Sequence, residues 1–375
     1  MAALQARSRV EVMRWNYWNP VKLRFGAGTF DEVAGLIGKR RYALVTYNQP
    51  IFNDLAARLT KVAGEPVAVI DNIETNPDCA DLLKSCRVFG AATQAPEVIV
   101  ALGGGSMMDA AKVLAASKGD FENVRRHLTD KVPLDTSAIV PIIAVPTTSG
   151  TGSEVTHWAT VWDSANGSKY SLAHPLLYPE AAVLDPQLIL GAPRGLTLAT
   201  GLDSLSHALE SIWNVNANPV SASFAVEAAR EIIETLPRLL DNLGDLDLRT
   251  RQARGSLLAG FAFSQTKTAL AHNISYDITL KTGLIHGIAC SFSLPLVMGW
   301  AIGNSADCDA ALRRIFGPDL NEGIRKLRSF LEGIGVKTDP AAYGVSPAEW
   351  TRLVEKALEG ERGRNFIGRP TVKAA

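Results

Sequence analysis

Four residues in the second half of the chain have the types and spacing of a metal site. In GLDSLSHALESIW, residues 201–213, Asp203 and His207 are four apart and the apolar residues recur at helical spacing, which puts both polar side chains on one helix face. The segment AHNISYDITLKTGLIHGIAC adds His272 and His286. One carboxylate and three neutral imidazoles suit Fe(II) or Zn(II) and leave room for a substrate oxygen. The alternative is a salt-bridged pair on a helix surface.

A triple glycine lies where a nucleotide could bind. VIVALGGGSMMDAAK places Gly103, Gly104 and Gly105 between a predicted strand and a predicted helix, so that free backbone N–H groups at the helix N-terminus could hold a pyrophosphate. Ser106 could cap this helix and donate to a phosphate, and Asp109 could fix the loop or a ribose hydroxyl. The alternative is a glycine turn that serves only close packing of strand and helix.

A second polar loop follows another predicted strand. VPTTSGTGSEVT, residues 145–156, carries the hydroxyls of Thr147, Thr148, Ser149, Thr151 and Ser153 beside two glycines. These hydroxyls could bind a nucleotide, or the loop could be a turn that satisfies its own backbone. Two such loops after two strands of one sheet favour a dinucleotide that spans both.

The two halves of the chain differ in the secondary structure that is predicted to position these residues. The first half alternates short apolar runs with helical segments, which predicts a mostly parallel sheet flanked by helices, and Asn166-Gly167 signals a hairpin. The second half reads as helix after helix. We expect a flexible tail over residues 1–18, an α/β dinucleotide-binding domain over 19–188 and an all-α metal-binding and catalytic domain over 189–375. The predicted strands cover 42–46, 67–70, 98–102, 139–145 and 182–184, and the predicted helices 30–36, 52–61, 79–89, 107–116, 196–213, 219–240, 250–264, 267–280, 305–314, 321–334 and 347–359.

Composition points to small-molecule chemistry. Lys plus Arg and Asp plus Glu each number 38 among 375 residues, so no electrostatic footprint for nucleic acid or a membrane surface is expected. The first residues, MAALQARSRVEVMRW, lack the continuous apolar core of a signal peptide, and no apolar run is long enough to cross a bilayer, so neither kind of segment is expected. The four cysteines lack C-x-x-C spacing and are expected to be idle thiols in a reducing cytoplasm.

The motifs together resemble the iron-containing (group III) alcohol dehydrogenase family. GGGSMMD, PTTSGTGSE, GLDSLSHALE and GLIHG occur in this order, and the likeness runs from NPVKLRFGAGTFDEV at residues 19–33 to RNFIGRP near the C-terminus. The resemblance implies the dehydroquinate synthase-like fold, a nicotinamide cofactor, NAD(H) or NADP(H), in the cleft, one divalent metal below it, and a homodimer. It implies the metal ligands Asp203, His207, His272 and His286, and the cofactor contacts Asn76, Gly103, Gly104, Gly105, Ser106, Asp109, Thr147, Thr148, Thr151 and Lys169.

Two positions depart from the family pattern. Many NAD-preferring members have an Asp where this chain has Tyr47, and without that carboxylate NADPH is permitted. Many members also have a histidine four residues after the third metal ligand, where this chain has Tyr276. Its phenol could bind the substrate or relay a proton, or the ring could be a core aromatic.

The departure at Tyr276 narrows the predicted class of substrate. TKTALAHNISY, with LAHP and LYPE at 172–180, resembles the phosphonoacetaldehyde reductase branch, whose members reduce a small phosphonate aldehyde. A phosphonate needs cations in the site, and Lys267 and Arg194 are the candidates, followed by Lys281. The expected function is therefore metal-dependent hydride transfer between NAD(P)H and a small, anionic aldehyde.

Other functions stay open. Sulfoacetaldehyde or a plain short-chain alcohol could be the substrate. Dehydroquinate-synthase-like and glycerol-phosphate-dehydrogenase-like enzymes share the two-domain plan, although the pairing of GGGSMMD with GLDSLSH is against them. A catalytically silent scaffold of the same fold is the alternative from a different class.

Overall fold

A parallel sheet forms the core of the N-terminal part, as predicted, but it has six strands, and its edge strand at Lys22–Phe25 was not among the predicted ones. The computed structural model describes residues 14–368, and the strand order is β1-β8-β5-β4-β2-β3. The strands are β1 (Lys22–Phe25), β2 (Tyr42–Val45), β3 (Ala68–Ile70), β4 (Val98–Gly103), β5 (Ile142–Pro146) and β8 (Ala181–Leu184).

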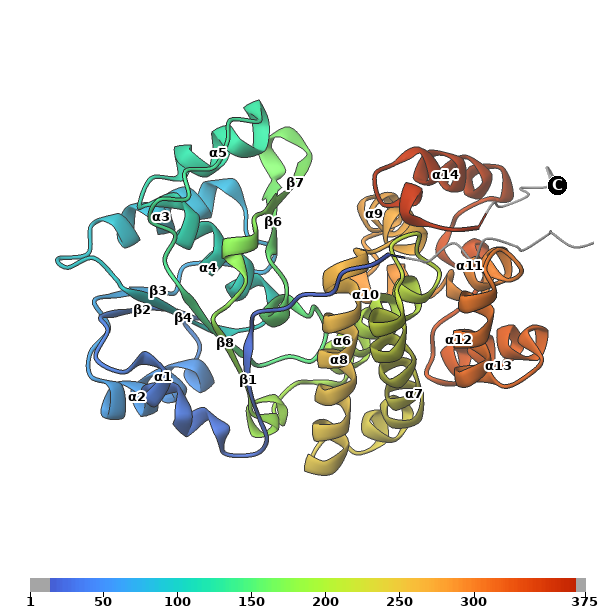
Figure 1. Ribbon diagram of the computed structural model, residues 1–375, viewed down its shortest axis with the longest axis horizontal. Coiled ribbons are helices and arrows are strands. Elements are labelled where there is room, and N and C mark those ends of the chain that lie inside the picture. Colours follow the sequence, from blue (N-terminus) through green and yellow to red (C-terminus); the bar gives the residue numbers. More distant parts are fainter. Residues whose placement is uncertain (1–13, 369–375) are drawn as a thin grey trace, which may run out of the picture.

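Helices cover both faces of this sheet (Figure 1). Because successive side chains of a strand point to opposite faces, Val98, Val100 and Leu102 of β4 pack with α1 (Val33–Ile37) and α2 (Pro50–Ala63). Ile99 and Ala101 of the same strand pack on the other side. The helices there are α3 (Cys79–Gly90), α4 (Gly105–Ser117) and α5 (Phe121–Asp130). Burial on both faces explains why the strands read as unbroken apolar runs.

The hairpin predicted at Asn166-Gly167 is present as β6 (Trp158–Asp163) and β7 (Ser168–Ala173). Its connection has four residues, because Asp163 pairs with Ser168. The Asp163 carboxylate accepts from the backbone N–H of Asn166, and Gly167 has a φ of 60°. The turn is therefore longer than the two-residue type that Asn-Gly usually indicates.

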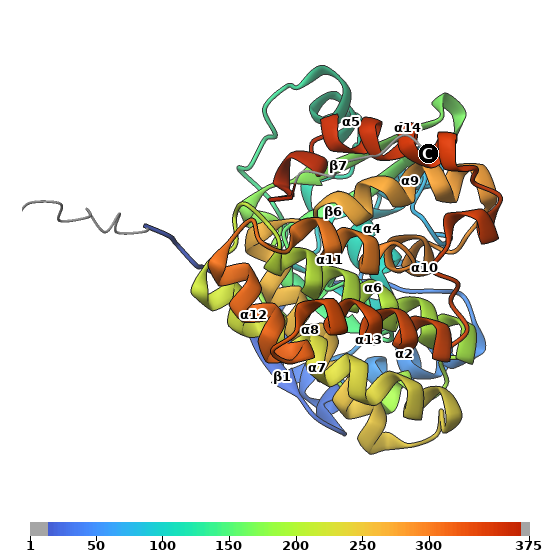
Figure 2. The same cartoon turned by 90° about the vertical axis from the view of Figure 1, so that its right-hand side faces the viewer.

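The C-terminal part is helical, which confirms the predicted fold class. Its apolar core is continuous and includes Leu205, Leu209, Trp213, Ile232 and Ile274, and α12 and α13 lie on its outer side (Figure 2). The helices are α6 (Arg194–Ile212), α7 (Pro219–Asp241), α8 (Leu246–Thr266), α9 (Leu270–Thr282), α10 (His286–Ser291), α11 (Leu294–Ala301), α12 (Ala306–Phe316), α13 (Leu320–Gly333) and α14 (Pro347–Glu359). Within residues 14–368 no helix combines the length and apolar character needed to cross a bilayer.

Helices α5, α10 and α11 were not among the predicted ones, and one predicted helix start is wrong. The helix expected over 267–280 begins at Leu270, because Lys267 ends α8 with a left-handed φ of 64°. Lys267 is therefore not one helical turn before His272 in a common helix. The division at residue 188 stays a prediction.

Residues 14–18, predicted as part of the tail, run beside α8. The Tyr17 hydroxyl donates to the carbonyl of Phe261 at 3.3 Å, and the Trp18 ring meets Tyr178 edge-on at 5.3 Å. Residues 1–13 of the predicted tail lie outside the described residues.

Candidate metal centre and cofactor cleft

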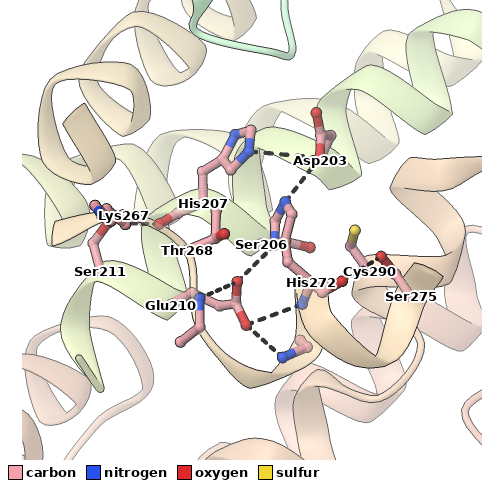
Figure 3. A network of polar contacts seen from close by, with 12 residues as sticks. Asp203, Ser206, His207, Glu210, Ser211, Lys267, Thr268, His272, Ser275 and Cys290 are labelled. Carbon is pink, nitrogen blue, oxygen red and sulfur yellow. Dashed lines mark hydrogen bonds and ion pairs between the residues drawn. The ribbon is translucent and has the colours of Figure 1, made fainter. Parts of the chain in front are cut away.

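The fold brings the four predicted ligands to one point. Asp203 and His207 come from α6, His272 from α9 and His286 from the first residue of α10. The Nε2 atoms of His207, His272 and His286 lie 3.7, 3.4 and 3.8 Å from the same oxygen, Oδ1 of Asp203. Figure 3 shows His207 and His272 both directed at this carboxylate. Nitrogen and oxygen donors at this spacing can share one cation.

The buried donors lack other partners. Asp203 Oδ1 and His272 Nε2 are enclosed and make no hydrogen bond among the described residues, a costly state for polar atoms unless something else binds them. Burial lowers the pKa of His207 to about 4, which keeps this imidazole neutral, as a metal requires. The pKa of His272 is raised, because the neighbouring Cys290, Glu210 and Asp203 outweigh burial. The anionic groups around His272 therefore favour a cation at its Nε2, either a proton or a metal, and one carboxylate with three imidazoles fits a divalent metal.

Glu210 orients one ligand and was missed from the sequence. This carboxylate is fully buried and lies 2.6 Å from Nδ1 of His272, which leaves Nε2 directed at Asp203. It also accepts from the backbone N–H groups of Ala269 and Ala271 at the start of α9. A carboxylate that holds the far nitrogen of a ligating imidazole fixes its tautomer and its ring orientation.

A glycine lets α10 approach α6. A Cβ on Gly287 would lie 1.9 Å from the carbonyl oxygen of Ala199, which is too close for any side chain. Gly287 follows His286 directly, so this contact sets the position of the fourth predicted ligand.

The glycine loop and the threonine loop pack against each other at the carboxyl ends of β4 and β5. A Cβ on Gly104 would lie 3.4 Å from Thr148 Oγ1, and one on Gly105 would lie 2.7 Å from Thr151 Oγ1. Packing against Thr151 thus leaves no room for a side chain at Gly105, whereas a Cβ on Gly104 would make an ordinary contact. Thr147 is joined to the same place, because its N–H donates to the carbonyl of Gly103.

Ser106 does not cap α4, contrary to expectation. The N-cap is Gly104, and no side chain caps it. The Ser106 hydroxyl instead accepts from the backbone N–H of Asn76 at 3.1 Å, and Asn76 has a left-handed φ of 63°. This bond holds the Asn76 turn at the N-terminus of α4, beside the glycine loop.

Two roles were predicted for Asp109, fixing a loop or binding a ribose hydroxyl. The structure shows that it fixes the threonine loop. Its two oxygens accept from the Ser153 hydroxyl at 2.8 Å and from the Thr160 N–H at 2.9 Å. Lys112, which the sequence analysis overlooked, is fully buried and donates to the carbonyls of Ser153 and Trp158. Together they tie the threonine loop and the hairpin to α4.

The threonine loop also touches the helix that carries Asp203. A Cβ on Gly150 would lie 2.6 Å from Cβ of Thr200, and the Ser204 hydroxyl donates to the Gly150 carbonyl at 3.2 Å. The predicted cofactor loop therefore contacts α6 one residue from the metal cluster.

Tyr276 lies between the cluster and two cations. Its ring is parallel to His286, with centroids 6.2 Å apart. Lys169 Nζ lies 4.0 Å and Arg362 Cζ 5.0 Å from the centroid of this ring. Neither cation has a carboxylate within ion-pair distance among residues 14–368. Burial, then the charge of Arg362, lowers the pKa of Lys169 to about 8, so an anion between them would be favoured.

The cations chosen from the sequence lie elsewhere. Lys267 is 56% exposed and pairs with Glu361 at 3.4 Å, Arg194 is exposed at the start of α6, and Lys281 pairs with Glu349. Each has the environment of a solvated surface charge.

Two other polar residues near the cluster, Glu210 and Cys290, could have been recognised from their spacing in the sequence. Glu210 is three residues after His207 in an apolar helix, and Cys290 is four residues after His286, the same spacing that singled out Asp203 and His207. Arg362 left no such signal, because the turn that carries it is far in sequence from the ligands.

Two family profiles match successive parts of the chain. One, iron-containing alcohol dehydrogenase, covers residues 20–186. The other, the C-terminal part of the Fe-containing alcohol dehydrogenase family, covers residues 197–371.

Individual relatives differ in substrate. The chain is 29% identical over 362 residues to an NAD-dependent methanol dehydrogenase of Bacillus methanolicus, covering 92% of this chain and 93% of that one. It is 38% identical over 237 residues to a phosphonoacetaldehyde reductase of Streptomyces viridochromogenes, a match over 61% of this chain and 58% of the relative. Among solved structures, sulfoacetaldehyde reductase from Bifidobacterium kashiwanohense, in complex with NAD+, superposes with a TM-score of 0.88 at 27% identity over 96% of both chains.

Replacing Glu210 by glutamine should weaken metal binding by about 10–100-fold, because the His272 imidazole would lose its anionic partner. The measurement is competition for Zn(II) against a chromophoric chelator. The matched control is Glu227→Gln on α7, whose side chain is 56% exposed. Equal affinities of wild type and Glu210→Gln would contradict the orienting role.

Glu154 should make stability depend on pH. Burial raises its pKa from 4.5 to about 7, so between these values the folded chain binds more protons than the unfolded chain. The free energy of unfolding of the wild type, relative to Glu154→Gln, should therefore fall by up to about 3 kcal/mol as the pH rises through this range.

Urea unfolding at pH 5 and at pH 7.5 measures this difference. The exposed Glu65, changed to glutamine, controls for loss of one carboxylate. A constant difference between wild type and Glu154→Gln at both pH values would contradict the prediction.

Proposed function

The chain belongs to the iron-containing alcohol dehydrogenase family, and from this premise we propose that it interconverts a small anionic aldehyde and its alcohol. It is a metal-dependent, NAD-linked oxidoreductase. The observation that carries the proposal is the convergence of Asp203, His207, His272 and His286 on one point near Tyr276 and the cations Lys169 and Arg362, which form no ion pair with residues 14–368.

The metal is held by Asp203, His207, His272 and His286. When bound, Fe(II) or Zn(II) supplies a Lewis acid that polarises a carbonyl. Glu210 keeps Nε2 of His272 directed at the site through its contact with Nδ1. The apolar helical core around α6 keeps Asp203, His207 and His272 largely out of water, which strengthens their electrostatic interactions, while the His286 side chain is 42% exposed.

The two loops at the carboxyl ends of β4 and β5 would hold the dinucleotide. In this proposal Gly103, Gly104, Gly105, Ser106 and Asp109 surround the pyrophosphate and Thr147, Thr148, Thr151, Lys169 and Asn76 complete the site. Because β2 is followed by Tyr47, which packs on Phe52 at 5.0 Å, no carboxylate of this turn opposes a 2′-phosphate, and both NADH and NADPH are accepted.

Tyr276 is the proposed proton donor to the substrate. Burial raises the pKa of its phenol, so the hydroxyl stays protonated and can donate a hydrogen bond to the substrate. In the reducing direction the proton on the product oxygen comes from Tyr276 or from solvent.

The proposal also specifies that the substrate carries a negative charge. Two cations flank the Tyr276 ring without carboxylate partners in the described chain, and a phosphonate or sulfonate would offset their repulsion. The relatives named for phosphonoacetaldehyde and sulfoacetaldehyde act on aldehydes of this kind. Phosphonoacetaldehyde is the first substrate to test, and sulfoacetaldehyde the second.

Removing the metal should abolish turnover. After dialysis against a chelator, NAD(P)H oxidation with phosphonoacetaldehyde should fall by at least about 1,000-fold, because no other group supplies comparable polarisation, and return with Fe(II) or Zn(II). Asp203→Ala should lose metal content and activity together, whereas Asp241→Ala, exposed at the end of α7, should keep both. Full activity in metal-free protein would refute the proposal.

Arg362→Ala should separate charged from neutral substrates. Because hydrogen bonds to charged groups contribute about 1.5–3 kcal/mol, kcat/KM for phosphonoacetaldehyde should fall about 10–100-fold, while that for propionaldehyde should change less than about 3-fold. Arg364→Ala, two residues along and exposed, is the matched control. An equal loss with both aldehydes, or a wild-type preference for propionaldehyde, would favour a neutral substrate.

A further inference from the structure

Cys290 lies at the metal cluster, although no motif of the sequence assigns it there. His286 begins α10 and Cys290 follows one turn later, so both side chains share a helix face. The Cys290 Sγ lies 3.5 Å from Nε2 of His286. The donor atoms of Asp203, His272, His286 and Cys290 all lie within 4.8 Å of one another.

The spacing fits a shared metal. With Zn–S of about 2.3 Å and Zn–N and Zn–O of about 2.0–2.2 Å, the angles of about 90–120° in a five-coordinate site separate a sulfur from a nitrogen by about 3.1–3.8 Å and a nitrogen from an oxygen by about 2.9–3.6 Å. The observed distances are 3.5 Å from Cys290 Sγ to His286 Nε2 and 3.4 Å from His272 Nε2 to Asp203 Oδ1. The thiol is thus as well placed as the imidazoles.

Unpartnered atoms around the thiol also indicate a cation. Asp203 Oδ1 and His272 Nε2 are buried without a hydrogen bond in the described part of the chain, and both belong to the same donor group as Cys290. The other cysteines have no such setting. Cys308, for example, lies in the apolar core of the helices.

We propose that Cys290 is a fifth protein donor to the metal and that it makes this centre prefer Zn(II) to Fe(II). On binding, the S–H proton passes to solvent and a sulfur–metal bond forms, with no change of oxidation state. A soft thiolate favours zinc over iron, whereas the other four donors accept either. This inference rests on the proposed metal site and assigns its metal.

Cobalt substitution tests the sulfur contact directly. Metal-free protein loaded with Co(II) should show a thiolate-to-cobalt charge-transfer band in the near ultraviolet. The band should be lost in Cys290→Ser and in Cys290→Ala, but kept in Cys308→Ser, which removes a buried thiol away from the site. Visible Co(II) bands in every variant show that the metal is still bound.

Metal competition tests the selectivity. From an anaerobic equimolar mixture of Zn(II) and Fe(II), the Zn:Fe ratio bound by wild type, measured by mass spectrometry of the elements, should exceed that of Cys290→Ser by about 10-fold or more.

The outcomes separate this inference from the proposed function. Visible cobalt bands without a near-ultraviolet band in wild type would overturn the role of Cys290 and leave the four-residue site intact, and so would an unchanged Zn:Fe ratio. Failure of wild type to bind Co(II) at all would overturn both. Loss of the band and of the preference in both Cys290 variants, with cobalt still bound, supports the inference.

Discussion

The structure depends on one buried carboxylate surrounded by imidazoles. Asp203 is 7% exposed, and its Oδ1 faces three Nε2 atoms without a hydrogen bond of its own among the described residues. Burying such groups is unfavourable unless a cation joins them. The apolar core packs α6, α9 and α10 together so that each contributes a donor, and Glu210 supports this arrangement by binding both His272 and the backbone at the start of α9.

Close backbone approach connects the sheet to this centre. Gly150 meets Thr200 of α6, and Gly152 meets Gly260 of α8, where a Cβ would lie 2.9 Å from the Gly260 Cα. Larger residues would move the threonine loop away from Asp203. The distance between the threonine loop and Asp203 is thereby fixed by packing.

Periodicity and motif spacing predicted most of the fold, because its strands are buried on both faces and its long helices have strong apolar patterns. The short α10 and α11 were missed, since six to eight apolar residues carry too little pattern, and Lys267 was misplaced because a left-handed residue interrupts an otherwise helical stretch. His286 and Cys290 have the same four-residue spacing as Asp203 and His207, but the predicted set of metal ligands did not include a cysteine. Arg362 could not be found from spacing, because only the tertiary fold brings it to Tyr276.

The two cations beside Tyr276 come from distant parts of the chain. Lys169 is on β7, while Arg362 precedes the turn Gly363–Asn365, which is joined to the end of α6 through the bond from Val215 N–H to the Asn365 carbonyl. During synthesis the donors Asp203 to Cys290 leave the ribosome well before Arg362 does. Because the apolar core around the donors also includes Val354, Ala357 and Phe366, the last segment of the chain completes the packing of α6 and α9 and places Arg362 at Tyr276 in one step.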